Sequence, residues 1–404
     1  MRSALAGLRV LDFCWVGAGA LVTKLLAEHG ADVIKIESRA RPDNLRVAPP
    51  FRPGVEGLDA SGYFASRNND KRSFALDMRH AKSRELALEL ATGCDLVTNN
   101  FRPGVMERWG LGYERLSALN PSVIYLSMPM NGSSGPDSQA IGFGATIAAQ
   151  AGLVHLSGKP DRDPIGTGTH YPDHIPSPGH ALVALLAVIL QRQKTGRGRL
   201  IELSQLESTV SLLGAAVVAT SVGAERATRN GNRVAEHSPS GVFRCSGEDD
   251  WIALAARDDG EWQALADVLG EPELAADRRF ATLAARKANE DELENRVSAS
   301  VAGWERWPLA RALQARGVPA WPVLSSKDIL EDEQLRTRGF WRKLEHPVMG
   351  ELTAPSAPFK GREARTGPER AAPLMGEHTR EIAGSLLGLS DAEIDRLTAE
   401  KVLW

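Results

Sequence analysis

Strand-like and helical patterns alternate along the N-terminal third of the chain. Residues 8–13 and 32–37 are apolar runs of strand length, and residues 20–29 between them have helical spacing that ends at Gly30. A strand–helix–strand unit of this kind makes its two strands parallel. Further predicted elements are helices at 84–92 and 113–119 and strands at 95–98 and 123–128. The pattern therefore predicts an α/β fold with a Rossmann-like, doubly wound parallel sheet.

The pattern changes near residue 220, where the polar, Gly- and Asn-rich segment 223–233 predicts a crossing into a second domain. Elements predicted after it are a strand at 250–255 and helices at 261–269, 285–302 and 308–316, which the apolar segment 318–323 follows. Residues 339–368 contain several prolines and are typical of a long connector, and residues 390–393 form a capping box before a last helix. We therefore expect a large domain at 1–222, a small α+β domain at 223–335, and a connector with a return to the large domain at 336–404.

The longest apolar helical pattern, residues 181–190, follows a segment that contains Asp173. Pro178 suits the first turn of this helix and Ser177 suits its cap, so Asp173 is expected just outside the positive end of a buried helix. A carboxylate in this place should stay ionised and could act as a nucleophile. A capping role for Asp173 is an equally good interpretation of the local pattern.

Composition excludes several classes of protein. The 48 basic and 51 acidic residues nearly cancel, with no basic run, so nucleic acid is not an expected partner. The three cysteines are far apart and form no CxxC pair, which argues against a disulfide framework and a metal site. Residues 1–10 lack a secretory pattern, and the apolar helix after Gly179 looks too short to span a bilayer. We expect a cytoplasmic protein without a membrane partner.

A glycine-containing turn, residues 16–21, follows the first strand. Its glycines could let backbone amides approach a phosphate at a helix N-terminus. The spacing is not GxGxxG, although Glu37 lies where a ribose-binding acid would lie. A tight strand-to-helix turn explains the glycines better than a nicotinamide cofactor does.

The order and spacing of several segments together resemble the class III CoA-transferases, the formyl-CoA transferase and carnitine CoA-transferase (CaiB/BaiF) family, along nearly the whole chain. The segments are Gly-Leu-Arg-Val-Leu-Asp-Phe at 7–13, residues 26–37, Asn-Asp-Lys-Arg-Ser-Phe-Ala-Leu-Asp at 69–77, Asn-Asn-Phe-Arg-Pro-Gly at 99–104, the Asp173 segment, Lys-Thr-Gly-Arg-Gly-Arg-Leu-Ile-Glu-Leu at 194–203, and Gly-Glu-His-Thr at 376–379.

The resemblance implies that Asp173 is a covalent nucleophile. In the family this carboxylate attacks an acyl-CoA to give a mixed anhydride, and the released CoA then forms an aspartyl-CoA thioester that the acceptor acid consumes. This chemistry needs no metal and no permanently bound cofactor, because coenzyme A enters and leaves as acyl-CoA substrate. The positions that the resemblance assigns to CoA binding are Val16, Gly17, Arg39, Leu76, Arg79, Asn100, Phe101 and Arg108. For Arg79, a solvated surface arginine is the alternative.

Two departures from the family pattern concern the substrate. Gly17 stands where formyl-CoA transferases carry a glutamine, and the polar segment 230–241 replaces their glycine-rich flap. Oxalate specificity is therefore not expected. Arg233 and His237 become candidates for recognising an acceptor carboxylate, with ordinary loop residues as an equal alternative. Together with Arg257 and the His-rich segment around Asp173, they favour a polar or dicarboxylic acceptor with succinyl-CoA as donor. An aromatic or branched acid is the alternative.

A racemase acting on α-methylacyl-CoA is the alternative with the same fold. That reaction needs a histidine where this chain has Phe143, whose ring cannot carry a proton. A base relocated to His170, His174 or His180, beside Asp173, is a further alternative, as is a non-catalytic CoA-binding protein. The resemblance also implies an interlocked homodimer whose active site is shared between subunits, with Phe143 and His170 near the substrate.

Overall fold

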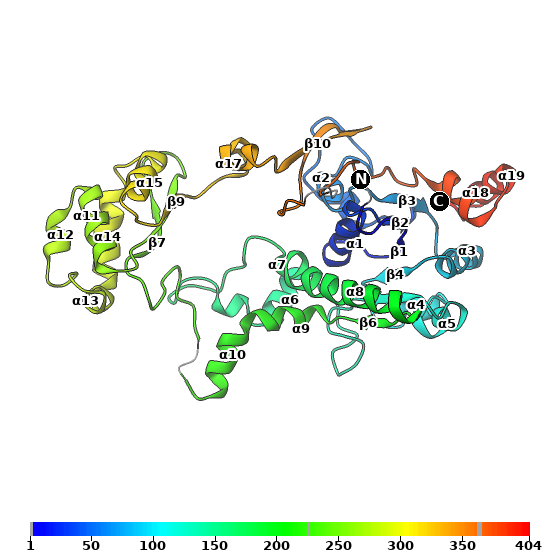
Figure 1. Ribbon diagram of the computed structural model, residues 1–404, viewed down its shortest axis with the longest axis horizontal. Coiled ribbons are helices and arrows are strands. Elements are labelled where there is room, and N and C mark those ends of the chain that lie inside the picture. Colours follow the sequence, from blue (N-terminus) through cyan, green and yellow to red (C-terminus); the bar gives the residue numbers. More distant parts are fainter. Residues whose placement is uncertain (1–2, 225–226, 362–365) are drawn as a thin grey trace. The chain divides into compact units, whose positions relative to one another are not determined.

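The computed structural model describes residues 3–224, 227–361 and 366–404. Parts of three predicted segments, 1–10, 223–233 and 339–368, lie outside these ranges. The chain divides into two compact units, one made of Met1–His155, Gly166–Ala227 and Arg336–Trp404, the other of Leu156–Ile165 and Thr228–Leu335 (Figure 1). The segment Leu156–Ile165 belongs to the second unit, whereas the sequence-based division placed it in the large domain.

The first unit is built on a six-stranded parallel sheet. Its strands are β1 (Arg9–Asp12), β2 (Asp32–Glu37), β3 (Arg72–Ala75), β4 (Leu96–Asn99), β5 (Ile124–Ser127) and β6 (Leu200–Glu202). Their order, β3-β2-β1-β4-β5-β6, is that of a doubly wound sheet, and every neighbouring pair is parallel. The predicted α/β fold is confirmed, and the strand order reverses between β1 and β4.

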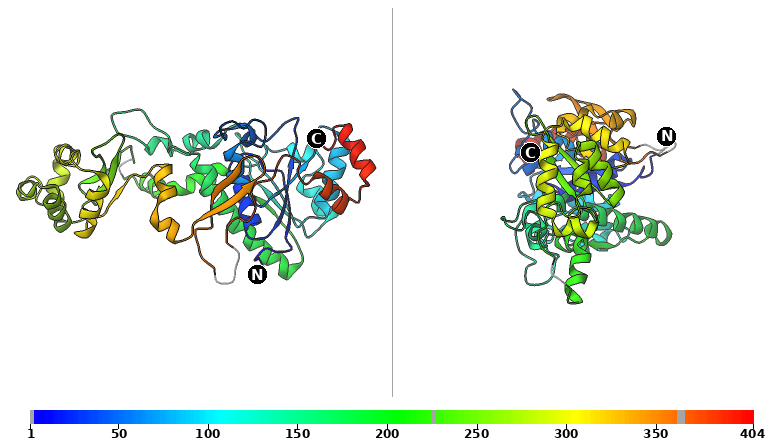
Figure 2. Two further views of the ribbon diagram at one scale, coloured as in Figure 1. Left: turned by 90° about the horizontal axis from the view of Figure 1, so that it is seen from above. Right: turned by 90° about the vertical axis from the view of Figure 1, so that its left-hand side faces the viewer.

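Helices cover both faces of this sheet (Figure 2). Helices of the first unit are α1 (Ala18–Glu28), α2 (Gly62–Arg67), α3 (Ala81–Thr92), α4 (Val105–Arg108), α5 (Tyr113–Leu119), α6 (Gly144–Gln150), α7 (Tyr171–His174), α8 (Pro176–Thr195), α9 (Gln205–Val210), α10 (Gly214–Ser221), α18 (Thr379–Leu387) and α19 (Asp391–Ala399), with short 3-10 helices at Asn44–Val47, Val154–Leu156 and Ser211–Leu213. Successive strand residues alternate between faces, so Val10 packs toward α1 and α8 whereas Leu11 packs toward α3 and α18.

The second unit has its own small sheet and core. Its antiparallel strands are β7 (Ser240–Arg244), β8 (Trp251–Ala255) and β9 (Ala320–Pro322), and its helices are α11 (Asp259–Leu269), α12 (Pro272–Ala276), α13 (Leu283–Ala288), α14 (Glu290–Val301), α15 (Arg306–Ala315) and α16 (Ser326–Glu331). Helix α17 (Glu333–Thr337) follows. Trp262 and Phe280 are fully buried in the core. The predicted helix 285–302 is in fact two, α13 and α14, which Asn289 separates.

The predicted connector 339–368 contains a hairpin that the sequence analysis missed. Strands β10 (Trp341–His346) and β11 (Gly350–Pro355) pair in antiparallel register, with Leu344 opposite Leu352. The predicted capping box at Ser390 and Glu393 is confirmed at the start of α19.

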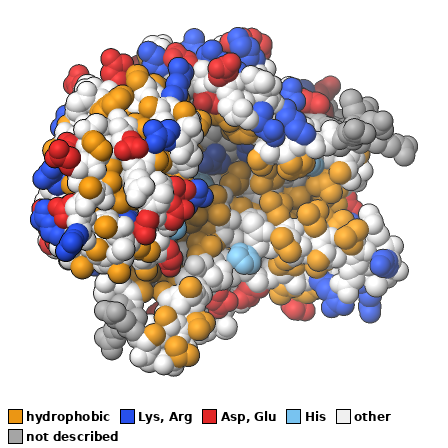
Figure 3. All heavy atoms as spheres, turned by 60° about the vertical axis from the view of Figure 1, so that its left-hand side comes forward, with side chains coloured by type: hydrophobic (Ala, Val, Ile, Leu, Met, Phe, Trp, Pro, Cys, Tyr) orange, Lys and Arg blue, Asp and Glu red, His pale blue; other side chains and the backbone are white. Residues whose placement is uncertain are grey.

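Helix α8 differs from its prediction in two ways. It begins at Pro176 with Ile175 as its cap, and its apolar surface is largely exposed in the single chain, with Val183 at 72% and Leu190 at 59%. The stretch Tyr171–Thr195 is also long and apolar enough to cross a membrane by length and composition, contrary to the expectation from sequence. One such helix is weak evidence, because helices of soluble proteins pass the same test. Hydrophobic side chains gather into an extended patch on the surface in Figure 3.

Candidate active site

Two loops meet where the strand order reverses, at the carboxyl ends of β1 and β4. The side-chain amide of Asn100 accepts a hydrogen bond from the Trp15 backbone amide (2.9 Å) and donates one to the Trp15 carbonyl (2.7 Å). The ring of Phe101 packs edge-on against Trp15, with ring centroids 5.6 Å apart. Ligands of doubly wound sheets bind at such a crevice.

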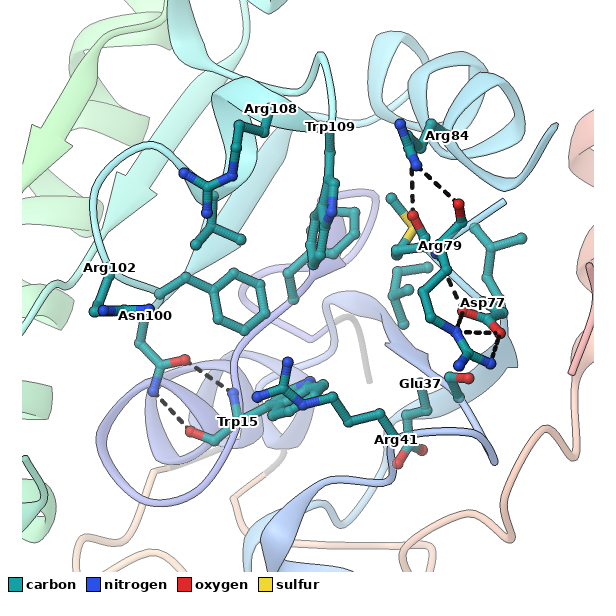
Figure 4. Close-up of a pocket in the computed structure, with 17 residues that line it drawn as sticks. Trp15, Glu37, Arg41, Asp77, Arg79, Arg84, Asn100, Arg102, Arg108 and Trp109 are labelled. Atoms are coloured by element: carbon teal, nitrogen blue, oxygen red, sulfur yellow. Dashed lines mark hydrogen bonds and ion pairs between the residues drawn. The ribbon is translucent and has the colours of Figure 1, made fainter. Parts of the chain in front are cut away.

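The larger cavity in this crevice has a volume of about 680 Å³. Its walls are mostly apolar, and its rim carries five arginines: Arg41, Arg79, Arg84, Arg102 and Arg108 (Figure 4). An apolar slot beside several guanidinium groups suits a flat heteroaromatic ring that carries phosphates. The dimensions are those of a pocket for a cofactor-sized molecule.

The structure brings most of the predicted CoA-binding residues into this crevice. Leu76, Arg79, Asn100, Phe101 and Arg108 line the larger cavity. Val16 and Gly17 line a smaller one of about 240 Å³. Their binding roles remain predictions.

Arg39 lies outside both cavities. Its guanidinium donates to the Met375 carbonyl (3.0 Å) and lies over the ring of Trp404. Arg41, two residues further along the chain, lines both cavities and places its guanidinium 5.2 Å from the centre of the Trp15 ring. The geometry therefore favours Arg41 over Arg39 as a ligand contact.

The smaller cavity connects the crevice to Asp173. It shares Trp15, Arg41, Asn100, Phe101 and Arg102 with the larger cavity, and Asp173 forms part of its wall. A ligand long enough to occupy both cavities would place one end at the larger cavity and the other at the Asp173 carboxylate.

Two glycines make room for Asp173. A Cβ atom on Gly17 would lie 2.6 Å from the Asp173 Cβ, and one on Gly144 would lie 2.8 Å from the Asp173 Oδ2. Non-bonded atoms essentially never come this close to a Cβ atom. A side chain at either position would therefore displace Asp173, and both positions require glycine. Asp173 itself lies in the short helix α7 and is only 5% exposed.

Burial sets the charge of Asp173. It raises the pKa of this carboxyl to about 6, and His170, a backbone hydrogen bond from Gly144 and Arg67 oppose the rise. The sequence analysis expected the carboxylate to stay ionised at the positive end of α8. The loss of solvent outweighs the favourable charges, so the pKa rises rather than falls. At neutral pH the ionised form still predominates about tenfold.

Tyr63 and Arg67 lie beside Asp173 and escaped the sequence analysis, whereas His174 was named there only as an alternative base. An Arg67 Nη lies 3.4 Å from the His174 Nδ1, and its guanidinium lies 5.6 Å from the centre of the Tyr63 ring. Burial, together with Arg67, lowers the pKa of His174 to about 4, so this imidazole is neutral. No sequence signal could join Arg67 to His174, because 107 residues separate them.

Phe143 and His170 both precede Asp173 in the sequence and lie near it in space. Phe143 lines the smaller cavity at the start of α6. His170 is exposed, and its carbonyl accepts a hydrogen bond from the Asp173 amide (2.9 Å). A proton shuttle at position 143 is chemically impossible for a phenyl ring.

Arg233 and His237 lie in the second unit. The Arg233 guanidinium is already paired with Asp291 (2.5 Å) and Glu294 (2.7 Å) and lies 3.8 Å from Glu290. These acids raise its pKa and satisfy its charge, so the structure opposes its predicted role in binding an acceptor carboxylate. His237 is half-buried and forms a β-bridge with Val234, and its predicted role stays a prediction.

Comparison with known proteins identifies the family. Residues 5–379 match the family described as CoA-transferase family III. The chain belongs to this family. The resemblance found in the sequence is thereby confirmed, and the protein is an enzyme of the CoA-transferase class.

Relatives with curated names are CoA-transferases. The chain is 36% identical to "Probable CoA-transferase Rv1866" of Mycobacterium tuberculosis over 98% of its length, and it spans half the length of that relative. It is 31% identical to "Succinyl-CoA--D-citramalate CoA-transferase" of Chloroflexus aurantiacus, covering 98% of this chain and 97% of the other. A crystal structure of a CaiB/BaiF family protein from Brucella suis superposes with a TM-score of 0.88 at 31% identity, covering 96% of this chain and all of that one.

Proposed function

We propose that this family III enzyme transfers CoA from succinyl-CoA, or a similar acyl-CoA, to a second, short dicarboxylic acid through a covalent intermediate on Asp173. The observation that carries the proposal is the buried Asp173 carboxylate, held between two glycines at the end of the crevice. Named relatives act on succinyl-CoA with D-citramalate, glutarate or mesaconate, which supports dicarboxylic substrates.

The first half of the reaction loads CoA onto the enzyme. An Asp173 oxygen attacks the thioester carbonyl of the donor, and the carbon–sulfur bond breaks to give a mixed anhydride and CoA thiolate. The thiolate then attacks the Asp173 acyl carbon, which releases the donor acid as its carboxylate and leaves an aspartyl-CoA thioester. The second half repeats these steps in reverse with the acceptor acid. No proton is consumed in either half. The donor acid leaves with one oxygen from Asp173, and one oxygen of the acceptor carboxylate replaces it.

The surroundings of Asp173 suit this chemistry. Burial keeps water away from the anhydride and the thioester, both of which hydrolyse readily. Desolvation also strengthens the carboxylate as a nucleophile, while its pKa of about 6 leaves it ionised at neutral pH. The arginine-rimmed cavity would hold the nucleotide part of CoA, with Arg41, Arg102 and Arg108 near its phosphates.

We further propose that the enzyme is a homodimer. Apolar side chains of α8 and α10 are exposed in the single chain, among them Val183, Leu190, Val217 and Val218. Exposed apolar surface of this extent is typical of a protein–protein interface. Light scattering should give a mass of about twice 43.6 kDa, whereas a monomer at micromolar concentration would contradict this proposal.

Trapping the intermediate tests the proposed function. Succinyl-CoA and hydroxylamine, incubated with the enzyme, should convert Asp173 to its hydroxamate, which peptide mass spectrometry detects. Asp173→Ala provides the matched control without a nucleophile. Exchange of an α-proton in deuterated water without any hydroxamate would favour a racemase instead.

A further inference from the structure

Arg67 is a half-buried cation without a carboxylate partner. Among the described residues, no acid lies within the 4.0 Å ion-pair distance of its guanidinium. Its Nε has no hydrogen-bond partner, and its contacts with Ser66 and His174 are long, at 3.4 to 3.5 Å. Arg46, which is fully buried, shows the usual arrangement, since it pairs with Glu37 (2.7 Å) and Asp59 (2.6 Å). Arg67 therefore has unused capacity to bind an anion.

The groups around Arg67 leave this charge uncompensated. Tyr63 and His174 lie against it, and Asp173 is the acid whose field reaches it. His174 is neutral, because its pKa is about 4. His170 adds no negative charge. Among the residues that the structure describes, Asp173 is thus the acid whose protonation and acylation set the charge balance of this region.

The reaction changes that balance. When Asp173 becomes an aspartyl-CoA thioester, its carboxylate charge disappears. Arg67 then loses the negative charge of Asp173 beside it, and an incoming anion is favoured in its place. The acceptor acid is the anion that must enter at this stage.

We propose that Arg67 binds the non-reacting carboxylate of dicarboxylic substrates and so determines specificity for them. The guanidinium lies beyond ion-pair distance from Asp173 but within reach of its field. A short acid whose first carboxyl group meets the Asp173 acyl carbon would extend its second carboxylate across this gap. The neighbouring Tyr63 ring limits the space and stabilises the guanidinium. This inference rests on the proposed transferase function.

A pair of acids that differ only in the second carboxyl group tests the proposal. Glutarate and valerate share a five-carbon chain, and they are compared as acceptors from succinyl-CoA, with kcat/KM measured for each. Arg67→Gln should lower the glutarate-to-valerate ratio on the order of 100-fold. Arg67→Lys, which keeps the charge but loses the planar fork, should restore part of the ratio. An equal loss for both acids would overturn the proposal and make Arg67 a positioning residue for Asp173.

A control in the CoA crevice separates recognition of the acid from recognition of CoA. Arg108→Gln should raise the KM for acyl-CoA and leave the glutarate-to-valerate ratio within about twofold of the wild type. Circular dichroism and thermal melting of each variant report whether it is folded. If the wild type forms no hydroxamate with any acyl-CoA, the transferase function itself is wrong. If it forms hydroxamate but does not prefer glutarate to valerate, only the role of Arg67 is wrong.

Discussion

Two groups of charged side chains in the first unit differ in whether each cation has an acidic partner. Beneath the loop after β1, Asp12 accepts hydrogen bonds from Lys71 (3.0 Å) and Thr23 (2.7 Å), and Lys35 pairs with Asp43 (3.0 Å). Every cation there has its acid. Beside Asp173, Arg67 has none within ion-pair distance in the described part of the chain. The balanced group holds the fold, and the unbalanced group is left open for substrate.

The balanced group also shapes the loop that carries Gly17. Lys35 donates to the Cys14 carbonyl (2.7 Å), and Asp43 accepts from the Val16 amide (3.1 Å). Val16 has a φ of 60°, which is rare for a β-branched residue and costs energy that the surrounding contacts must offset. These contacts bring the next residue, Gly17, against the nucleophile.

Removing one cation from each group should give the largest difference, and the difference is in the free energy of unfolding. Lys71→Met leaves Asp12 charged and buried, so we expect it to lower the free energy of unfolding by about 3–5 kcal/mol. Arg67→Met removes a charge that has no partner, so it should change this free energy by less than about 1 kcal/mol. Urea denaturation measures both. An equal loss of unfolding free energy in the two variants would contradict the distinction between the two groups.

A smaller effect is expected from adding one methyl group against the nucleophile. Gly17→Ala would force Asp173 to move, because the new Cβ would lie 2.6 Å from the aspartate Cβ. We expect kcat to fall about 100-fold, as a displacement of the order of 1 Å can cost this much. Gly303→Ala is the matched control, since the new Cβ would approach no closer than 3.9 Å to the backbone oxygen of Ser300. Unchanged kcat in Gly17→Ala would show that Asp173 need not lie where the structure places it.

The pH dependence of hydroxamate formation tests whether Arg67 interacts with the Asp173 carboxylate. Only ionised Asp173 attacks, so the rate of hydroxamate formation should fall tenfold per pH unit below about pH 6. Arg67 lowers this pKa, so Arg67→Gln should move the midpoint upward. His174, with a pKa of about 4, stays neutral across this window. A midpoint that does not move in the variant would mean that Arg67 does not interact with the nucleophile.

The raised pKa of Asp173 also makes the stability of the fold depend on pH. Folded Asp173 holds its proton more tightly than the unfolded chain does, so its contribution to stability is present below about pH 4 and is lost as pH rises through about 6. Asp173→Asn removes this penalty. At pH 7.5 it should therefore be at least as stable as the wild type while being inactive, which separates catalytic loss from unfolding.

The smallest expected effect on activity comes from replacing Arg79 at the rim of the CoA crevice. The Arg79 side chain is 72% exposed and forms an ion pair with Asp77 (2.6 Å), so solvent screens its charge. Arg79→Ala should raise the KM for acyl-CoA less than about fivefold and leave kcat unchanged. A larger rise would place Arg79 directly on the nucleotide.

Much of the fold was predictable because its elements have strong local patterns. Residues 32–37 and 113–119 are observed as β2 and α5 with the predicted bounds. The hairpin of β10 and β11 was missed because its prolines at 347 and 355 look like loop signals, although Pro355 lies at the end of a strand in a two-stranded sheet.

The candidate site was predictable only in part. Asp173 and Asn100 stand in distinctive local segments, so sequence alone could single them out. The close approach of Gly17 and Gly144 to Asp173 and the charge of Arg67 depend on contacts between distant segments, which no local pattern records. The apolar face of α8 was expected to be buried, and a sequence pattern does not distinguish a core from an interface.

An oxygen-transfer experiment tests the role of Asp173 most directly. With succinyl-CoA and an acceptor acid labelled with ¹⁸O in its carboxyl groups, each completed turnover should leave one acceptor oxygen on the Asp173 carboxylate. After a single turnover, mass spectrometry of the peptide that contains Asp173 should show a gain of about 2 Da, from one ¹⁸O in place of ¹⁶O. Complete transfer of CoA with no label in this peptide would contradict the account.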